Sequence, residues 1–253
     1  MPILDVNGCN LYYSVKGEGV LIVFIHPPVL TSFNFHYQLE ELSQSFKVIT
    51  FDIRGHGESQ YSKKTVTYPL IVEDIKHLLD HLNINKAFIC GYSTGGSIVL
   101  EYLLNSSDRA LGGIVIGGMS EVNTFNLKGK INLGAFLAAK GAVPLLAFAI
   151  SWGNCNKRKL FLKLDQEARK GNKRNIEQYF RYSLHYNCTR QLNKIDLPIL
   201  LVYGSKDKSF YSYARILHKK LPRNKLIFFN AKHQIPTKAA TELNEMISQF
   251  VKT

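Results

Sequence analysis

Cysteine is scarce in this sequence of 253 residues, and its four cysteines lie far apart along the chain. No two of them have the C-x-x-C spacing that is typical of a zinc or redox site. We therefore expect no metal and no cofactor, and we expect reduced thiols in a cytoplasmic protein. The four are Cys9, Cys90, Cys155 and Cys188.

A long uninterrupted apolar run is also missing. The longest apolar stretch, residues 133–152, contains Lys140, Gly141 and Pro144, so it falls short of the roughly 20 apolar residues that a membrane-spanning helix needs. Residues 1–12 carry Asp5 and no apolar core of the kind found in secretory signals. We expect no integral membrane association.

Acidic residues are few relative to basic ones: 19 Asp and Glu stand against 32 Lys and Arg, a net charge of +13. This excess is compatible with nucleic acid, an anionic membrane or an acidic substrate as partner. Disorder is excluded, because 45% of the residues are hydrophobic and only 20% are charged. Residues 119–190 hold 13 basic and 4 acidic residues, whereas residues 1–118 hold 8 and 11, so the positive charge is concentrated.

Short apolar runs of strand length alternate with stretches of helical spacing, which favours parallel β-α-β units. Residues 119–190 break this rhythm, because they are helical in tendency and contain no credible buried strand. We therefore predict an α/β core domain made of residues 1–118 and 191–253, with residues 119–190 as an insertion. The predicted strands are 20–25, 47–51, 87–90, 111–116, 199–203 and 225–229; the predicted helices include 71–82, 95–104, 211–221 and 237–251.

The segment from Gly91 to Gly96 contains the pattern G-x-S-x-G, between a predicted strand and a predicted helix. A serine on so sharp a turn needs small neighbours, because side chains at Gly91 or Gly95 would crowd the bend. The helix N-terminus behind it offers backbone N–H groups suited to an oxyanion. The spacing fits neither a P-loop nor the dinucleotide-binding pattern. These features predict Ser93 as a nucleophile.

A serine nucleophile needs a histidine base and an orienting carboxylate. Asp207 follows the predicted strand 199–203, and His233 follows the predicted strand 225–229. The chain order serine, aspartate, histidine is expected when each loop leaves the carboxyl edge of a parallel sheet. Of eight histidines, only His26, His56 and His233 lie in loops after predicted strands.

With these motifs the sequence resembles the α/β-hydrolases over nearly its whole length. Residues 52–59 match the family's D-x-R-G-H-G-x-S loop, and His26 follows the third strand. The resemblance implies a mostly parallel central sheet flanked by helices, with residues 119–190 as a helical cap (lid) inserted after the sixth strand. It implies a catalytic triad of Ser93 as nucleophile, His233 as general base and then acid, and Asp207 as orienting carboxylate. His56 is expected to be structural.

The same resemblance implies cleavage of carboxylic esters with small to medium acyl groups, through an acyl-serine intermediate. A serine nucleophile argues against haloalkane dehalogenase and epoxide hydrolase activity. One departure concerns the oxyanion hole: relatives usually place an N–H donor two residues after the histidine, but Pro28 has no N–H. We expect Thr94 as one donor and Val29 as the second, and we expect His26, Tyr92 and Tyr179 in the substrate pocket.

Alternatives remain at this stage. The basic cap could steer an anionic ester substrate, or it could simply be a solvated charged face. A slow-turnover signalling member of the fold, binding an anionic ligand or an acidic protein through its cap, is the main alternative function. A menaquinone-pathway synthase is disfavoured, because Ser97 stands where that enzyme has an arginine. No nucleic-acid partner is expected, because no known binding motif accompanies the charge.

Overall fold

The computed structural model describes residues 2–155 and 157–253. An eight-stranded sheet has the order β1-β2-β4-β3-β5-β6-β7-β8. Strands β3 to β8 run parallel to their neighbours, whereas β2 is antiparallel to β4, and β1 to β2. The strands are β1 Ile3–Asp5, β2 Asn10–Lys16, β3 Leu21–Ile25, β4 Lys47–Phe51, β5 Ala87–Tyr92, β6 Ala110–Ile116, β7 Ile199–Gly204 and β8 Asn224–Phe229.

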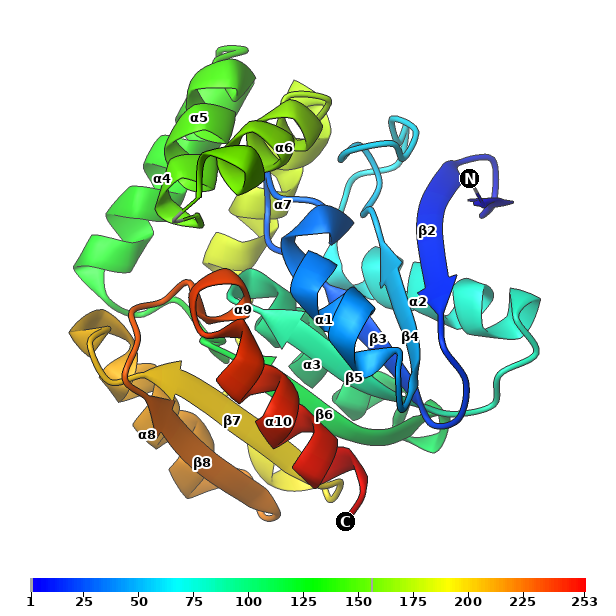
Figure 1. The fold of residues 1–253 in the computed structure, drawn as a ribbon. Coiled ribbons are helices and arrows are strands. Elements are labelled where there is room, and N and C mark those ends of the chain that lie inside the picture. The colour runs from blue at the N-terminus through cyan, green and yellow to red at the C-terminus, as the bar shows by residue number, and fades with distance from the viewer. Residues whose placement is uncertain (1, 156) are drawn as a thin grey trace.

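Helices flank this sheet on both faces, which confirms the predicted fold class (Figure 1). Helices α1 and α10 pack on one face, and α2, α3 and α8 pack on the other. None of the helices in the described part of the chain is long and apolar enough to cross a membrane. The helices are α1 His36–Leu42, α2 Tyr68–His81, α3 Thr94–Asn105, α4 Phe125–Ala139, α5 Val143–Gly153, α6 Arg158–Ala168, α7 Lys173–His185, α8 Tyr211–Lys220, α9 Ile235–Lys238 and α10 Ala240–Val251.

The central strands are apolar on both faces because helices cover both sides of the sheet. In β3, Ile22 and Phe24 pack into the core beneath α1 and α10, whereas Val23 and Ile25 pack into the core on the opposite face. All five residues of β3 are buried. Continuous apolar runs of this kind are what made these strands visible in the sequence.

Between β6 and β7 the chain forms four helices, α4 to α7, which gather to one side of the sheet (Figure 1). Within them, residues 157–174 hold 8 basic and 2 acidic residues and do not form one helix. They contain α6, which ends at Ala168, and the start of α7 after Gly171. The C-terminal helix predicted at 237–251 is likewise divided: α9 and α10 are separated by Ala239, whose φ and ψ of −136° and 44° are not helical.

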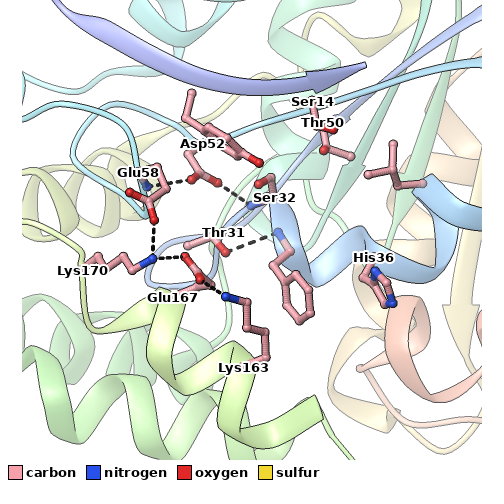
Figure 2. A pocket seen from close by; sticks show the side chains of 13 residues that line it. Ser14, Thr31, Ser32, His36, Thr50, Asp52, Glu58, Lys163, Glu167 and Lys170 are labelled. Carbon is pink, nitrogen blue, oxygen red and sulfur yellow. Dashed lines mark hydrogen bonds and ion pairs between the residues drawn. The ribbon is translucent and has the colours of Figure 1, made fainter. Parts of the chain in front are cut away.

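Asp52 joins the loop after β3 to the loop after β4 (Figure 2). Its buried carboxylate accepts hydrogen bonds from the backbone N–H of Ser32, at 2.7 Å, and of Glu58, at 2.9 Å. The side chain of Glu58 in turn pairs with Lys170, which also lies 2.6 Å from Glu167 on α6. The loop after β4 is thereby tied to the helices between β6 and β7.

Asp52 is expected to make the stability of the protein depend on pH. Burial raises the pKa of Asp52 from 3.8 to about 6, although the two N–H donors act in the opposite direction. The folded protein therefore binds the proton of the Asp52 carboxyl group more tightly than the unfolded chain does. The free energy of unfolding then falls as the pH rises from about 4 to about 6. The difference amounts to about 3 kcal/mol. Urea denaturation across this pH range should therefore give a flatter stability curve for Asp52→Asn.

An asparagine amide facing N–H donors will lower the free energy of unfolding at every pH. The test is therefore the slope of the free energy of unfolding against pH, not its absolute value. The control is Asp108→Asn, since Asp108 is exposed; its curve should run parallel to that of the wild type. If the Asp52→Asn and wild-type curves are parallel, the expected role of Asp52 is refuted.

Candidate active site

Ser93 occupies a strained turn between β5 and α3. Its φ and ψ are 55° and −121°, a conformation that costs energy for a residue with a side chain. The turn is tight: a Cβ on Gly91 would lie 2.2 Å from the carbonyl oxygen of Gly95, and one on Gly95 would lie 2.2 Å from that of Ile25. The N–H of Ser93 donates to the carbonyl of Ile116 on β6 at 2.8 Å. The turn therefore holds a half-buried serine at the carboxyl end of the sheet.

The structure brings together the three residues predicted as a triad. Nε2 of His233 lies 3.1 Å from Oγ of Ser93, and Nδ1 of His233 lies 2.9 Å from Oδ2 of Asp207. Asp207 follows β7 and His233 follows β8, so all three side chains reach the same edge of the sheet. Ser209 donates a further hydrogen bond, at 2.7 Å, to the other carboxylate oxygen of Asp207.

The electrostatics suit an orienting carboxylate. Burial acts to raise the pKa of Asp207, but hydrogen bonds and charge from His233, with the Ser209 hydroxyl, hold it below its usual value of 3.8. An ionised Asp207 accepts a hydrogen bond from the Nδ1–H of His233, which leaves the Nε2 lone pair directed at Ser93. The imidazole is also held by Phe210 and Tyr92, whose ring centroids lie 4.2 and 5.2 Å away.

A cavity of about 270 Å³ lies above Ser93. Its walls are mostly apolar, and much of the apolar surface comes from the helices between β6 and β7. Within the described residues, no Lys or Arg lines it, so the positive charge of the chain does not reach the cavity wall. The lining includes Leu127 and Ile131 of α4, Ile150 of α5, Phe180 of α7, and Met119 and Leu30.

Two backbone N–H groups were predicted as oxyanion donors. Thr94 is the first residue of α3, where N–H groups have no acceptor within the helix. Val29 has a φ of 73°, which is rare for a β-branched residue. In the part of the chain that the structure describes, the Val29 N–H has no hydrogen-bond acceptor, and the side chain is fully buried. Thr94 lines the cavity, whereas Val29 is not among its lining residues. The role of Val29 as the second oxyanion donor remains a prediction.

Of the residues predicted for the substrate pocket, Tyr92 lines the cavity. His26 does not, because its ring joins two loops: Nε2 accepts the Ile53 N–H at 2.9 Å, and Nδ1 lies 2.9 Å from the Pro27 carbonyl oxygen. Complete burial lowers the pKa of His26 well below 6.5, so the ring stays neutral. The expectation of a pocket role for His26 is corrected accordingly.

Tyr179 also lies outside the cavity lining, which is a second correction. Its buried hydroxyl donates to the carbonyl oxygen of His26 at 2.9 Å, and its ring packs against Tyr68 with centroids 6.1 Å apart. Tyr182 and Tyr186 pack on the same Tyr68 ring. Of the aromatic residues on α7, Phe180 lines the cavity. Tyr179 and Tyr182, with Tyr186 just after the helix, pack α7 against the core.

Tyr179→Phe tests this structural assignment. Loss of the hydroxyl leaves a buried carbonyl without its donor and should lower the free energy of unfolding by about 1–2 kcal/mol. The rate of ester hydrolysis should stay near the wild-type value, because the side chain does not touch the cavity. Tyr182→Phe is the matched control on the same helix, since no described residue hydrogen-bonds to its hydroxyl. A Tyr179→Phe variant with wild-type stability and altered ester preference would restore the pocket role.

Two features of the site were not predicted from the sequence. Asn154, just after α5, is buried, lines the cavity and accepts a hydrogen bond from the Tyr92 hydroxyl at 3.3 Å. Ser209 supports Asp207. Neither belongs to a motif, so no local signal could have found them. In the described residues, no group of three or more His, Cys, Asp or Glu side chains is arranged to hold a metal ion.

Comparison with known proteins agrees with this fold. Residues 20–236 match the family model described as the alpha/beta hydrolase fold. The AB hydrolase superfamily protein YisY of Bacillus subtilis is 23% identical, and the match covers 95% of each chain. Among solved structures, the enol-lactonase of Burkholderia xenovorans is 20% identical with a TM-score of 0.89, covering 100% of both chains. An esterase of Exiguobacterium antarcticum is also 20% identical with a TM-score of 0.89, covering 99% of this chain and 98% of the other.

Proposed function

Because the chain belongs to the α/β-hydrolase fold family, we propose that it is a serine hydrolase that cleaves carboxylic esters through an acyl-serine intermediate. The observation that carries this proposal is the continuous hydrogen-bonded chain from Asp207 through His233 to Ser93. Solved structures of similar fold include an esterase and an enol-lactonase. Both of those names denote hydrolysis of a carboxylic ester bond.

In the proposed mechanism, Oγ of Ser93 attacks the ester carbonyl carbon while Nε2 of His233 takes the hydroxyl proton. The negative charge that forms on the carbonyl oxygen is stabilised by the N–H of Thr94 and the N–H of Val29. The C–O bond to the alcohol then breaks, and His233 returns the proton to the departing alkoxide. A water molecule, deprotonated by His233, then attacks the acyl-serine. The bond between the acyl carbon and Oγ breaks, His233 returns the proton to Oγ of Ser93, and the carboxylic acid is released.

The cavity supports a neutral acyl group of small to medium size. Its volume of about 270 Å³ is slightly below the range of roughly 300–1,000 Å³ that is usual for ligand pockets, and its wall is mostly apolar. An anionic substrate, which the charge of residues 119–190 suggested, would find no Lys or Arg among the described lining residues. The cavity therefore does not explain why residues 119–190 are so strongly basic.

A second candidate is favoured by one observation, Pro28 at the position of the usual oxyanion donor. Loss of one such donor typically lowers the rate by about 10²- to 10³-fold. If Val29 does not replace it, the protein is a slow-turnover member of the fold that binds a ligand, and its cap binds an anionic ligand or an acidic partner.

Hydrolysis of p-nitrophenyl esters separates these candidates. The panel runs from acetate to decanoate and includes an anionic succinate monoester. We expect kcat/KM to be highest for the short and medium neutral chains and lower for the succinate. If no ester is turned over faster by the wild type than by Ser93→Ala, the hydrolase proposal fails.

A further inference from the structure

The helices between β6 and β7 expose an unusual amount of apolar surface. Of the twelve large hydrophobic side chains that are exposed among the described residues, seven lie on α4, α5 and α6. Where exposed apolar side chains are contiguous, they mark an interaction site. The seven are Phe125, Leu133, Phe136, Leu145, Phe148, Trp152 and Leu162.

The centre of this surface is a cluster that we call the aromatic patch: Leu145, Phe148 and Trp152 of α5, with Phe161 and Leu162 of α6. The three aromatic rings contact one another, with centroids 5.4 to 6.4 Å apart. Trp152 is 65% exposed, Leu162 55% and Phe148 48%. The three α5 residues are spaced i, i+3, i+7, so they share one face of the helix.

Helix α5 is apolar on its other side as well. Val143, Leu146 and Ala147 are buried, and Ile150 lines the cavity above Ser93. The eleven residues of α5 include no charged side chain. A helix that is apolar all round is normally covered on all sides. The outer face of α5 therefore requires something to cover it.

Cations surround the aromatic patch. A groove of about 590 Å³ combines Trp152, Phe161 and Leu162 with Lys157, Arg158 and Lys238. A neighbouring groove shares Lys157 and Leu162 and adds Lys159 and Lys163. No acidic residue of the described chain lines either groove. Lys157, Arg158 and Lys159 are exposed and form no ion pair with any described residue.

We propose that the aromatic patch and its surrounding cations dock the protein on an anionic lipid surface. Aromatic and aliphatic side chains would enter the boundary between headgroups and acyl chains, and the Lys and Arg side chains would pair with lipid phosphates. Their long apolar stems can lie along the same boundary. This use accounts for the positive charge that the cavity leaves unexplained.

Two other occupants fit less well. In a symmetric dimer formed through the patch, each copy would place its cationic rim against the same rim of the other, which is repulsive. A protein partner would normally find polar groups for roughly ten hydrogen bonds. Besides hydrocarbon and cationic groups, the patch offers one indole N–H, that of Trp152, and the only hydroxyl of α5, that of Ser151, is buried.

The test uses the intrinsic fluorescence of the full-length protein, because Trp152 is the only tryptophan in the sequence. Vesicles of equal parts phosphatidylcholine and phosphatidylglycerol should shift its emission to the blue at low salt, and pure phosphatidylcholine should not. Added salt should reverse the shift. Cosedimentation should likewise show binding to the anionic vesicles at low salt and little binding to pure phosphatidylcholine vesicles. No shift and no sedimentation with the anionic vesicles would overturn the proposal, whatever the outcome of the ester panel.

Variants locate the binding surface. The double variant Phe148→Ser, Leu162→Ser retains Trp152, whose fluorescence reports binding. It should weaken vesicle binding by about tenfold or more. Phe228→Ser, at an exposed site on β8, should not weaken it. Since neither patch residue lines the cavity, hydrolysis of a water-soluble ester should be unchanged in the double variant. Equal weakening by the patch and the β8 variants would overturn the proposal.

The cations are tested in the same way. A triple Gln variant at Lys157, Arg158 and Lys159 should lose binding to anionic vesicles. A triple Gln variant at Lys219, Lys220 and Lys225 makes the same change in charge at exposed positions on α8 and β8 and should retain it. If both triple variants lose the same amount of vesicle binding, the binding depends only on net charge, and the proposal is overturned.

Two further results would assign the patch to another occupant and overturn the lipid proposal. One is a dimer, in sedimentation velocity, that becomes a monomer in the Phe148→Ser, Leu162→Ser variant. The other is a blue shift with polyglutamate but none with anionic vesicles, which would identify an acidic protein segment as the partner.

Discussion

Ser93→Ala is expected to lower kcat/KM for a p-nitrophenyl ester by about 10⁴- to 10⁶-fold. The reason is geometric: Ser93 supplies the only oxygen that stands 3.1 Å from Nε2 of His233 among the described residues, so no neighbouring side chain can take over the attack. Binding of the ester should survive, because the substitution removes one atom from the cavity. Steady-state kinetics measures the fall in kcat/KM, and thermal melts of the variant with and without the ester measure whether it is folded and still binds the ester.

Ser97→Ala, in the first turn of the helix that follows Ser93, is the matched control. The Ser97 hydroxyl donates to the carbonyl oxygen of Met119 at 2.6 Å and does not contact His233. This variant should lose some stability but keep its activity within a few fold. If Ser93→Ala retains wild-type activity while folded, Ser93 is not the nucleophile.

Asp74→Ala is expected to lower the free energy of unfolding by about 3–5 kcal/mol. Asp74 on α2 and Arg54 after β4 are both buried, and Nε and one Nη of Arg54 each donate to Asp74 at 2.6 Å. Removing the carboxylate leaves a buried guanidinium whose remaining hydrogen bond goes to the Val6 carbonyl at 3.0 Å. Urea denaturation of the two proteins measures the difference.

Asp80→Ala gives a direct comparison. The Asp80 carboxylate also lies 2.6 Å from an arginine, Arg109, but its side chain is 59% exposed, so its removal should cost less than about 1 kcal/mol. The double variant Arg54→Met, Asp74→Leu should recover much of the loss of the single variant, because no unpaired charge remains. Equal effects of Asp74→Ala and Asp80→Ala would contradict the role given to burial.

The sequence predicts the buried part of the sheet well, because strands covered on both faces are continuous apolar runs. Strand β2 escaped prediction: it is half-buried, with Leu11, Tyr13 and Val15 alternating with polar residues, a weaker signal. Ser93, Asp207 and His233 could also be predicted, because each lies in a loop directly after a parallel strand. That position fixes which edge of the sheet a side chain reaches.

Contacts between distant segments could not be read in this way. His26 follows a strand just as His233 does, but its ring contacts the backbone of two loops, at Pro27 and Ile53, and does not face the cavity. Leu162 and Leu164 lie on one short helix, yet Leu162 is exposed and Leu164 is buried. The buried residues Leu160, Leu164 and Ala168 recur at every fourth position of α6, but Leu162 places an apolar side chain on the opposite face, so the pattern alone does not mark Leu162 as exposed.

The most direct test of the proposed function is the site of reaction with a fluorophosphonate, followed by mass spectrometry of the intact protein and of its peptides. A serine activated by His233 displaces fluoride and retains the phosphonyl group. We predict one adduct in the wild type, located on Ser93, and none in Ser93→Ala. An unmodified wild type, or an adduct that persists on another residue in Ser93→Ala, would contradict the account.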